Sequence, residues 1–325
     1  MIRFSSWLAP YFRRFVQLKR AGGAAFDSQE RLLARFDRFV GSRRRPPLRR
    51  QVLVDYLESL APLFARSREN AVGLVWTALA HAQRHGAVIE LVVRPPAPSG
   101  SLRRRRPRII MPSEFETILA AARTLQDWPR PRNARSPTGG LRSATTATLL
   151  GLLYTTGIRI GEAHGLDIGD LDVEAKVLTV RRGKFSKTRL LPVCASTVRA
   201  LKEYIDHPRR RAPRETSSPL FVSGRRRRLV HGVAINNFRA AYRDAAIALP
   251  HPRPHDLRHS FAVCRLASWY AQGRDVDSLL PILSTYLGHV SVENTRTYLT
   301  ANGLLLDRAA TLFAARTSFL DEVFS

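Results

Sequence analysis

Cysteine and acidic residues are scarce in this chain of 325 residues. Its two cysteines, Cys194 and Cys264, exclude a disulfide scaffold and a four-cysteine zinc site, and they suit a reducing compartment. Asp and Glu number 26 against 53 Lys and Arg, which gives a formal net charge of +27. Because a positive field this large repels itself, we expect the partner to be a polyanion.

Long apolar runs are also missing. The most apolar stretch, residues 143–158, has 16 residues and falls short of the ~20 that a bilayer-spanning helix needs. The first twenty residues are basic and contain no acid, as in a transit peptide. An amphipathic helix of the fold is the simpler interpretation, because their apolar residues recur at helical spacing: Trp7, Leu8, Tyr11, Phe12, Phe15 and Val16.

Lysine is rare even among the basic residues. The chain has five, namely Lys19, Lys176, Lys184, Lys187 and Lys202, and its other basic residues are arginine. Arginine binds phosphate well but does not release its proton near neutral pH. A position that keeps lysine in such a chain therefore raises the question of whether a transferable proton is needed there.

The length favours two domains, and the basic excess is concentrated in the first third of the chain. Residues 1–110 hold 22 Lys and Arg against 7 Asp and Glu. Their apolar residues recur at helical spacing in four segments: Phe4–Leu18, Ser28–Val40, Val52–Ala65 and Asn70–Gln83. We predict a small helical domain with basic surfaces over residues 1–93.

A linker is predicted over residues 94–110. Its prolines block helix continuation, and a run of four arginines resists burial. A solvated tether and a segment lying along a phosphate backbone fit this composition equally well.

The second predicted domain covers residues 111–325. Ser113 and Glu116 are spaced as a capping box at the start of its first helix. Later segments are typical of strands, at Val177–Val180 and Leu190–Val193, with Leu220–Val222 as a possible further strand. Helical sequence then resumes and continues towards the end of the chain.

Two local signals come first in this domain, one that suits the binding of an anion and one that suits a proton donor. Gly157 breaks one helix and Arg159 lies in the first turn of the next, where free backbone N–H groups and the helix dipole favour negative charge. A simple pair between Arg159 and Glu162 explains that motif as well. The hairpin loop from Gly183 to Lys187 holds two of the five lysines, which are ordinary exposed charges unless a proton donor is needed.

The third signal is His255-Asp-Leu-Arg258-His259. On a helix, His255 and Arg258 lie on one face. A metal site must be weighed, because His251, His255 and His259 recur every four residues. Against a metal, the glutamate of a His-Glu-x-x-His motif is missing and Arg258 would repel a cation. A phosphate suits a His and Arg pair better.

The fourth signal is Leu-Gly-His289, followed nine residues later by Tyr298. Such a tyrosine is most often a core or interface residue, so the pattern alone does not select it. In their order, however, the four signals resemble the tyrosine recombinase (phage integrase) family, whose catalytic set runs Arg, Lys, His-x-x-Arg, His or Trp, and Tyr. The match covers residues 154–300 strongly, and the ordered set is specific although each motif alone is weak. Residue by residue, the resemblance implies the catalytic set Arg159, Lys184, His255, Arg258, His289 and Tyr298.

The resemblance also implies a fold and an activity. The fold class is mainly α with a small β-sheet: an N-terminal helical, SAM-like core-binding domain followed by an α+β catalytic domain. The activity is site-specific recombination or integration of DNA, through a 3′-phosphotyrosyl intermediate and for a mobile genetic element. Tyr298 would be the nucleophile, with His255 as its base and Lys184 as the acid for the leaving 5′-oxygen. Lys187 is a nearby rival to Lys184.

The implied partner is double-stranded DNA, bound by a homo-tetramer on two duplexes, with accessory recombinases or directionality proteins as further partners. No cofactor and no metal are expected, because the exchange conserves bond energy. A bacterial, cytoplasmic and nucleoid-associated protein is expected, without membrane contact. The residues that we expect to bind DNA outside the catalytic set are Arg43, Arg44, Arg45, Arg103, Arg104, Arg105, Arg106 and Lys187.

Two departures and two alternatives remain. The segment between Arg258 and His289 is longer than in compact members and resembles the transposon-borne branch, while residues 1–100 match only in general character. A type IB-like topoisomerase shares the same chemistry but acts as a monomer. A non-catalytic DNA-binding protein on the same fold is the other alternative, although all six catalytic positions hold competent residues. The apolar segment Gly303–Ser325 fits docking onto a neighbouring subunit and packing on its own domain equally well.

Overall fold

The structure is a computed structural model. It describes residues 2–24, 26–41, 46–90, 94, 107–127, 140–181, 188–208, 210, 217–289, 291–296 and 298. The chain divides into two compact units, residues 1–105 and residues 106–325. Each unit has a buried core of its own. The assignment of these units as core-binding and catalytic domains stays a prediction.

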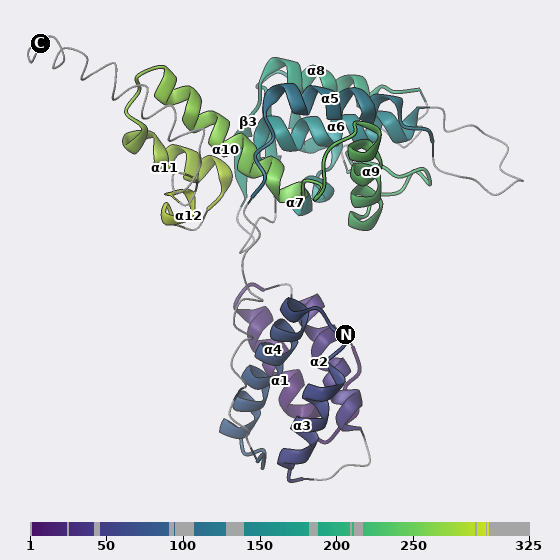
Figure 1. Ribbon diagram of the computed structural model, residues 1–325, viewed down its shortest axis with the longest axis vertical. Helices are drawn as coiled ribbons and strands as arrows, with labels where there is room; N and C mark the ends of the chain where they lie inside the picture. The colour runs from purple at the N-terminus through teal and green to yellow at the C-terminus, as the bar shows by residue number, and fades with distance from the viewer. Residues whose placement is uncertain are drawn as a thin grey trace, which may run out of the picture. The chain divides into compact units, whose positions relative to one another are not determined.

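The described residues of the first unit form the helices α1 (Ala9–Ala21), α2 (Asp27–Val40), α3 (Arg50–Ser59) and α4 (Ala65–Arg84). The amphipathic helix expected near the start of the chain is α1, which buries Phe12, Phe15 and Val16. Both α1 and α2 pack on α4 (Figure 1). The buried carboxylate of Asp37 on α2 accepts the backbone N–H of Ser5 at 2.6 Å. This bond fixes the segment that precedes α1 against α2.

The central helix of the second unit is α6 (Leu141–Thr156), which carries a single charged side chain, Arg142. A helix that is covered on most sides must be nearly uncharged. Four helices pack against it: α5 (Pro112–Thr124), α8 (Ala195–Ile205), α9 (His231–Asp244) and α10 (Pro254–Ala271) (Figure 1). Because α6 is held from several sides, the residues that follow its C-terminal end start from a fixed position.

The first helix of this unit begins differently from the prediction. Pro112 lies in the first turn of α5 and Met111 is the N-cap, with no side-chain hydrogen bond to the cap. The predicted capping box of Ser113 and Glu116 is therefore wrong. The fixed φ of proline suits the first helical position and its missing N–H costs nothing there, so Pro112 begins the helix instead.

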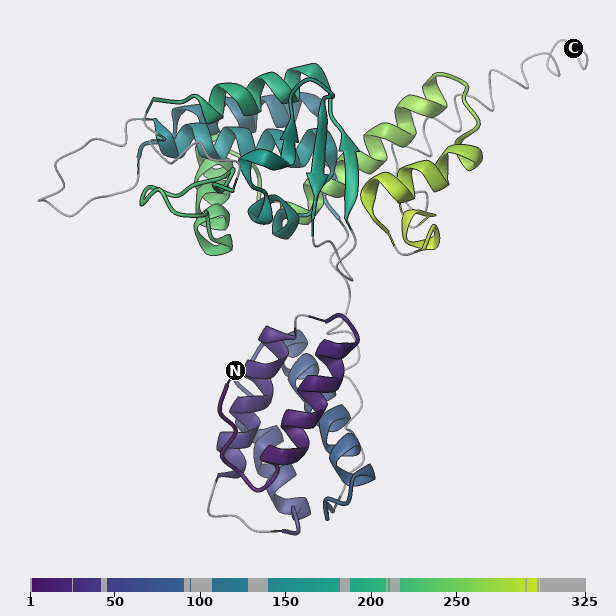
Figure 2. The ribbon, with the colours of Figure 1, turned by 180° about the vertical axis from the view of Figure 1, so that it is seen from behind.

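A small antiparallel sheet lies in the same unit, in the order β1 (Leu171–Asp172), β2 (Val177–Val180), β3 (Arg189–Pro192) (Figure 2). Buried Leu178 pairs with buried Leu191 in the hairpin of β2 and β3. The possible strand at Leu220–Val222 does not join this sheet. Val222 instead makes an isolated bridge to Arg228, because the chain reverses in the tight turn between them.

The last described helices are α11 (Val276–Leu287) and α12 (Glu293–Arg296). They lie beside the second half of α10 (Figure 1), and a separate buried cluster joins α10, α11 and Tyr298. The short helix α7 (Ile160–Gly165) follows α6 directly, and the 3-10 turn η1 (Ile168–Asp170) precedes β1. The mainly helical fold with a small sheet is as predicted. In the described part of the chain, no helix combines the length and apolarity that crossing a membrane requires.

Candidate active site

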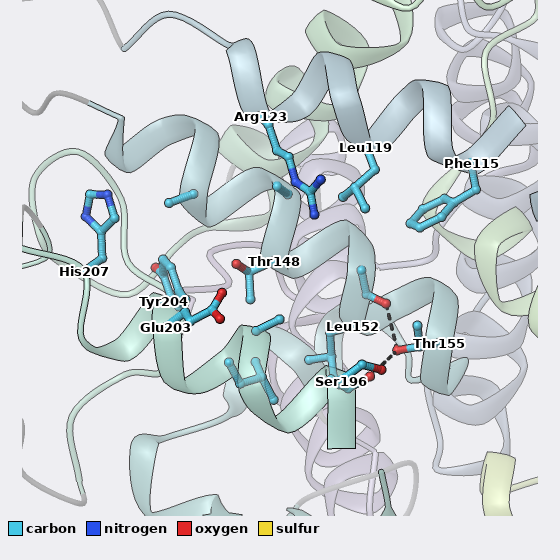
Figure 3. A pocket seen from close by; sticks show the side chains of 16 residues that line it. Phe115, Leu119, Arg123, Thr148, Leu152, Thr155, Ser196, Glu203, Tyr204 and His207 are labelled. Carbon is cyan, nitrogen blue, oxygen red and sulfur yellow. Dashed lines mark hydrogen bonds between the residues drawn. The ribbon is translucent and has the colours of Figure 1, made fainter. Parts of the chain in front are cut away.

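One cavity of the second unit lies apart from the predicted catalytic residues. This open hollow of about 370 Å³ is formed by α5, α6 and α8, and it is lined mainly by apolar side chains such as Leu119 and Leu152. Figure 3 shows Thr155 at one end, where its hydroxyl donates to the Gly151 carbonyl at 2.9 Å. None of the predicted catalytic residues that the structure describes lines this cavity, and these residues lie instead around the ends of several helices.

The end of α6 places the first candidate residue. Gly157 has φ +63°, and a Cβ at this position would approach the Phe261 ring to 2.6 Å, so only glycine fits the turn. The chain then enters α7 with Arg159 as its N-cap. The Arg159 guanidinium donates to Glu162 at 2.8 Å and to the Gly288 carbonyl at 3.0 Å. Arg159 therefore makes the local pair with Glu162 and also reaches a residue 129 positions away.

Glu162 is shared by a second arginine that the sequence did not single out. Arg189, the first residue of β3, donates through Nη1 and Nη2 to the two carboxylate oxygens at 3.0 and 2.8 Å. Its Nε donates to the Tyr286 carbonyl at 3.1 Å. Burial alone would raise the pKa of Glu162, but the hydrogen bonds and charge of Arg189, together with Arg159, lower it to about 2. Through these bonds the Arg189 guanidinium links β3 to α7 and α11.

Arg258 is the most deeply buried of the candidate residues, at 1% exposure. From α10 it donates to the Gly157 carbonyl at 2.8 Å and to the Leu287 carbonyl at 2.7 Å, which joins the ends of α6 and α11. Its Nε is buried and has no hydrogen-bond partner in the structure as described. Burial and the charge of Arg159 lower the pKa of Arg258 to about 10. The carbonyl oxygens carry no full charge that could balance the guanidinium, and no carboxylate pairs with it among the described residues, so its positive charge can still attract an anion.

The histidines lie around Tyr298. His255 and His259 are one turn apart on α10, with ring centroids 4.6 Å apart. The ring of His259 meets that of Tyr298 edge-on at 5.2 Å, and the ring of His289 stacks near it at 5.9 Å. His251, the third histidine of the four-residue series, stacks instead on Tyr242 at 5.9 Å. Among the described residues, no group of three or more possible ligands is arranged to hold a metal ion.

These surroundings keep the histidines neutral. Burial and the charges of Arg258 and Arg159 lower the pKa of His289 to about 4. The pKa of His255 is also lowered, first by partial desolvation and then by the same two arginines. A neutral imidazole has one nitrogen free to accept a proton.

Tyr298 itself is 6% exposed in this structure and belongs to the core cluster of α10 and α11. Its backbone N–H donates to the Thr295 carbonyl at 3.0 Å, which places the tyrosine one turn after the buried threonine. Burial raises the pKa of Tyr298, and the charges of Arg258 and Arg159 oppose that rise.

Five of the six predicted catalytic residues are thus brought together by the ends of α6, α10 and α11. The sixth, Lys184, and its rival Lys187 lie outside the described residues. The same holds for the other residues that we predicted to bind DNA, namely Arg43, Arg44, Arg45, Arg103, Arg104, Arg105 and Arg106.

Exposed basic residues occur elsewhere in the second unit, where the sequence analysis did not place them. On α9, Asn236, Arg239 and Arg243 are exposed and recur at spacings of three and four residues, so they form one stripe. The tight turn before α9 exposes Arg225 to Arg227. The sequence contains this stripe only as a spacing of three and four residues on a helix. Our prediction of DNA-binding residues rested instead on clusters of consecutive arginines.

Comparisons with known proteins agree on one family. The Phage integrase family model matches residues 110–303. The chain is 33% identical over 323 residues to y4rE of Sinorhizobium fredii, a protein named as an integrase/recombinase, and the match covers 99% of both proteins. It is 35% identical over 209 residues to the tyrosine recombinase XerD of Mycobacterium tuberculosis, across 63% of this chain and 59% of XerD.

Solved structures show the same fold. The Tn1549 transposon integrase, in complex with a circular intermediate DNA, matches with a TM-score of 0.64 at 18% identity, over 94% of this chain and 98% of that one. A lambda integrase dimer bound to a core site matches with a TM-score of 0.57 at 15% identity, over 90% of this chain and 95% of that one.

Proposed function

This chain belongs to the phage integrase family of tyrosine recombinases, and we propose that it cuts and rejoins DNA for a mobile genetic element through a 3′-phosphotyrosyl intermediate. One observation carries this proposal. Tyr298 lies in ring contact with His289 and His259, within the field of Arg258 and Arg159. This proximity supports Tyr298 as the proposed nucleophile, with the arginines and histidines beside it as the proposed phosphate-binding groups.

The arginines would neutralise the phosphate. A phosphodiester repels an attacking oxygen, and more negative charge accumulates in the transition state. Arg258 has a buried Nε without a partner among the described residues, and Arg159 and His289 supply further donors at the same helix ends. Removing one such donor is expected to cost about 2.7–4 kcal/mol of transition-state stabilisation, as for an oxyanion-hole donor.

Tyr298 would attack the phosphorus, and the bond to the 5′-oxygen would break. A phenol needs a base or a positive field to ionise, because its ordinary pKa is ~10. His255 suits the role of base, since its pKa is lowered and the ring is neutral near pH 7. The proton for the leaving 5′-oxygen would come from Lys184. Attack of that 5′-hydroxyl on the phosphotyrosine reverses the step and reseals a strand.

Double-stranded DNA is the proposed partner, and the exposed stripe of Asn236, Arg239 and Arg243 is a proposed contact surface. Arginine pairs with phosphate through its fork of donors, and both arginine and asparagine read base edges. A homo-tetramer on two duplexes is part of the proposal. Residues 303–325, which fit docking onto a neighbouring subunit and packing on their own domain equally well, lie outside the described residues.

A covalent-adduct assay tests the proposal. The full chain is incubated with a pool of nicked duplexes of randomised sequence, and DNA that stays bound in SDS is sequenced. We expect wild-type protein to trap a defined sequence, and Tyr298→Phe to bind the same duplex without forming an adduct. Tyr286→Phe is the matched control, because the Tyr286 hydroxyl donates to the Pro192 carbonyl at 3.1 Å, away from the phosphate site. An adduct with Tyr298→Phe would show that another residue is the nucleophile.

The same assay separates the alternatives. A type IB-like topoisomerase would trap DNA of any sequence and relax plasmids as a monomer, and the named relatives above are recombinases and integrases instead. A non-catalytic DNA-binding protein would trap no DNA at all.

A further inference from the structure

Thr295 connects the histidine and the tyrosine of the proposed site. It lies on α12 with no exposed surface. Its hydroxyl is 2.8 Å from Nδ1 of His289, and its carbonyl accepts the backbone N–H of Tyr298 at 3.0 Å. One buried residue thus contacts the His289 ring and the backbone of the nucleophile.

The contact with His289 has two possible directions. The Thr295 hydroxyl can donate to Nδ1, in which case the ring proton of a neutral imidazole is on Nε2. Alternatively Nδ1–H donates to the hydroxyl, and Nε2 is left with a lone pair. Only the first arrangement offers a donor to a phosphate oxygen, because a lone pair on Nε2 would repel it.

In the DNA-free protein, His289 does not hold two protons near pH 7. Burial and the charges of Arg258 and Arg159 lower its pKa to about 4, so the ring carries one proton near pH 7. The backbone of His289 is fixed as well, since its N–H donates to the Ser284 carbonyl at 3.0 Å after the αL turn at Gly288. The tautomer is the remaining freedom, and the Thr295 hydroxyl is the group positioned to select it.

We propose, on the basis of the function proposed above, that Thr295 is a positioning residue whose hydroxyl holds His289 in the Nε2–H tautomer and links that state to the placement of Tyr298. The link follows from geometry, because the hydroxyl and the carbonyl of one residue make both contacts. When α12 is in place, the donor and the nucleophile are ready together. A displacement of α12 would break both contacts at once.

A pair of substitutions separates the hydroxyl from the volume of the side chain. Thr295→Val keeps the branched shape and removes the hydroxyl, whereas Thr295→Ser keeps the hydroxyl and removes a methyl group. The measurement is single-turnover adduct formation on the duplex selected by the assay above. We expect Thr295→Val to slow adduct formation about tenfold, by analogy with the lower end of the effect of removing a partner that orients a metal-binding histidine. Thr295→Ser is expected to stay within about threefold of wild type, since the hydrogen bond survives.

The background of His289→Ala tests the route of the effect. If Thr295 acts through His289, the change to valine has no further effect once that ring is gone. Equal slowing by Thr295→Val in the presence and absence of the His289 ring would overturn the proposal, as would equal slowing by the serine and valine variants.

A direct measurement keeps this inference separate from the proposed function. Ring ¹⁵N shifts of the DNA-free protein report the tautomer of His289, whose signals are identified by their loss in His289→Gln. We expect Nε2–H in wild type and in Thr295→Ser, and a mixture in Thr295→Val. An Nδ1–H tautomer in wild type refutes the inference even if Tyr298 is the nucleophile. Conversely, if Tyr298→Phe still forms the adduct, the proposed function fails whatever tautomer is observed.

Discussion

Replacing Glu162 by glutamine tests whether this carboxylate holds the site together. Glu162 is 8% exposed and accepts four hydrogen bonds, from the Arg159 backbone, the Arg159 side chain and both terminal nitrogens of Arg189. Glutamine has nearly the same shape but no charge, and its amide NH₂ faces one guanidinium with the wrong polarity. The two arginines then repel each other without a common partner.

Two routes give the size of the effect. The pKa of Glu162 falls from 4.5 to about 2 on folding, and at ~1.36 kcal/mol per pKa unit this difference corresponds to about 3 kcal/mol of stability at neutral pH. Removing one partner of a buried ion pair costs about 3–5 kcal/mol. The lower figure suits this site, because Arg159 and Arg189 keep 27% and 14% of their side-chain surface exposed. For a unit of this size, a loss of 3 kcal/mol lowers Tm by about 6–12 °C.

Calorimetry of the full chain at several pH values measures this effect. Because the folded pKa is depressed, the contribution of Glu162 is complete above pH 4.5 and is lost as the pH falls towards 2. Wild type and Glu162→Gln should therefore differ most near pH 7 and converge in acid. The control is Glu293→Gln, whose exposed carboxylate lies 3.8 Å from Arg296 and should contribute under about 0.5 kcal/mol. Equal Tm values for the two variants, or a difference that stays constant with pH, would refute the reasoning.

Three further predictions concern the same unit. Gly288→Ala should destabilise the protein more than Gly273→Ala does, as measured by thermal unfolding. Both glycines have positive φ, but an added Cβ would meet the Arg189 guanidinium at 2.9 Å at position 288 and nothing within 4 Å at position 273. Arg239→Ala on the exposed α9 stripe should weaken binding of the selected duplex. If Arg239 contacts one phosphate, the slope of log K against log salt should also fall by about 0.9. Arg199→Ala, at the exposed arginine of α8, is the control and should change neither quantity. His289→Gln should reduce the loss of stability that urea titrations measure as the pH falls from 6.5 to 4. The reason is that the imidazole of His289 binds a proton more readily in the unfolded chain than in the folded one. An unchanged dependence of stability on pH in this range would contradict the lowered pKa.

The residues that sequence reasoning found are those whose signals are local. A glycine after an apolar helix predicts an αL end, which Gly157 and Gly288 both adopt. The spacing of His255 and Arg258 predicts a shared helical face, and both lie at the start of α10. The roles of these residues came from the family resemblance, and they stay proposals.

The residues that it missed depend on contacts between distant segments. Arg189 and Glu162 are 27 residues apart, on a strand and a helix, and nothing in either neighbourhood requires their pairing. His259 was considered only as a metal ligand, because its regular spacing was visible while its contact with Tyr298 was not. Thr295 is one of many threonines, and it becomes distinctive only when α12 brings it against His289.

One carboxylate, Glu162, offsets part of the positive charge that the arginines bring to the site. Glu162 accepts hydrogen bonds from both terminal nitrogens of Arg189 and from Arg159. Arg258 instead donates to two backbone carbonyls and interacts with the phenol of Tyr298, and no carboxylate pairs with it among the described residues. The lowered pKa of Arg258 is the electrostatic cost of that arrangement in the DNA-free protein. A second carboxylate beside Arg258 would remove this cost and stabilise the free protein. It would also occupy the donors that a phosphate needs and repel the phosphate itself. If the site binds a phosphodiester as proposed, it must therefore remain short of negative charge until the DNA supplies it.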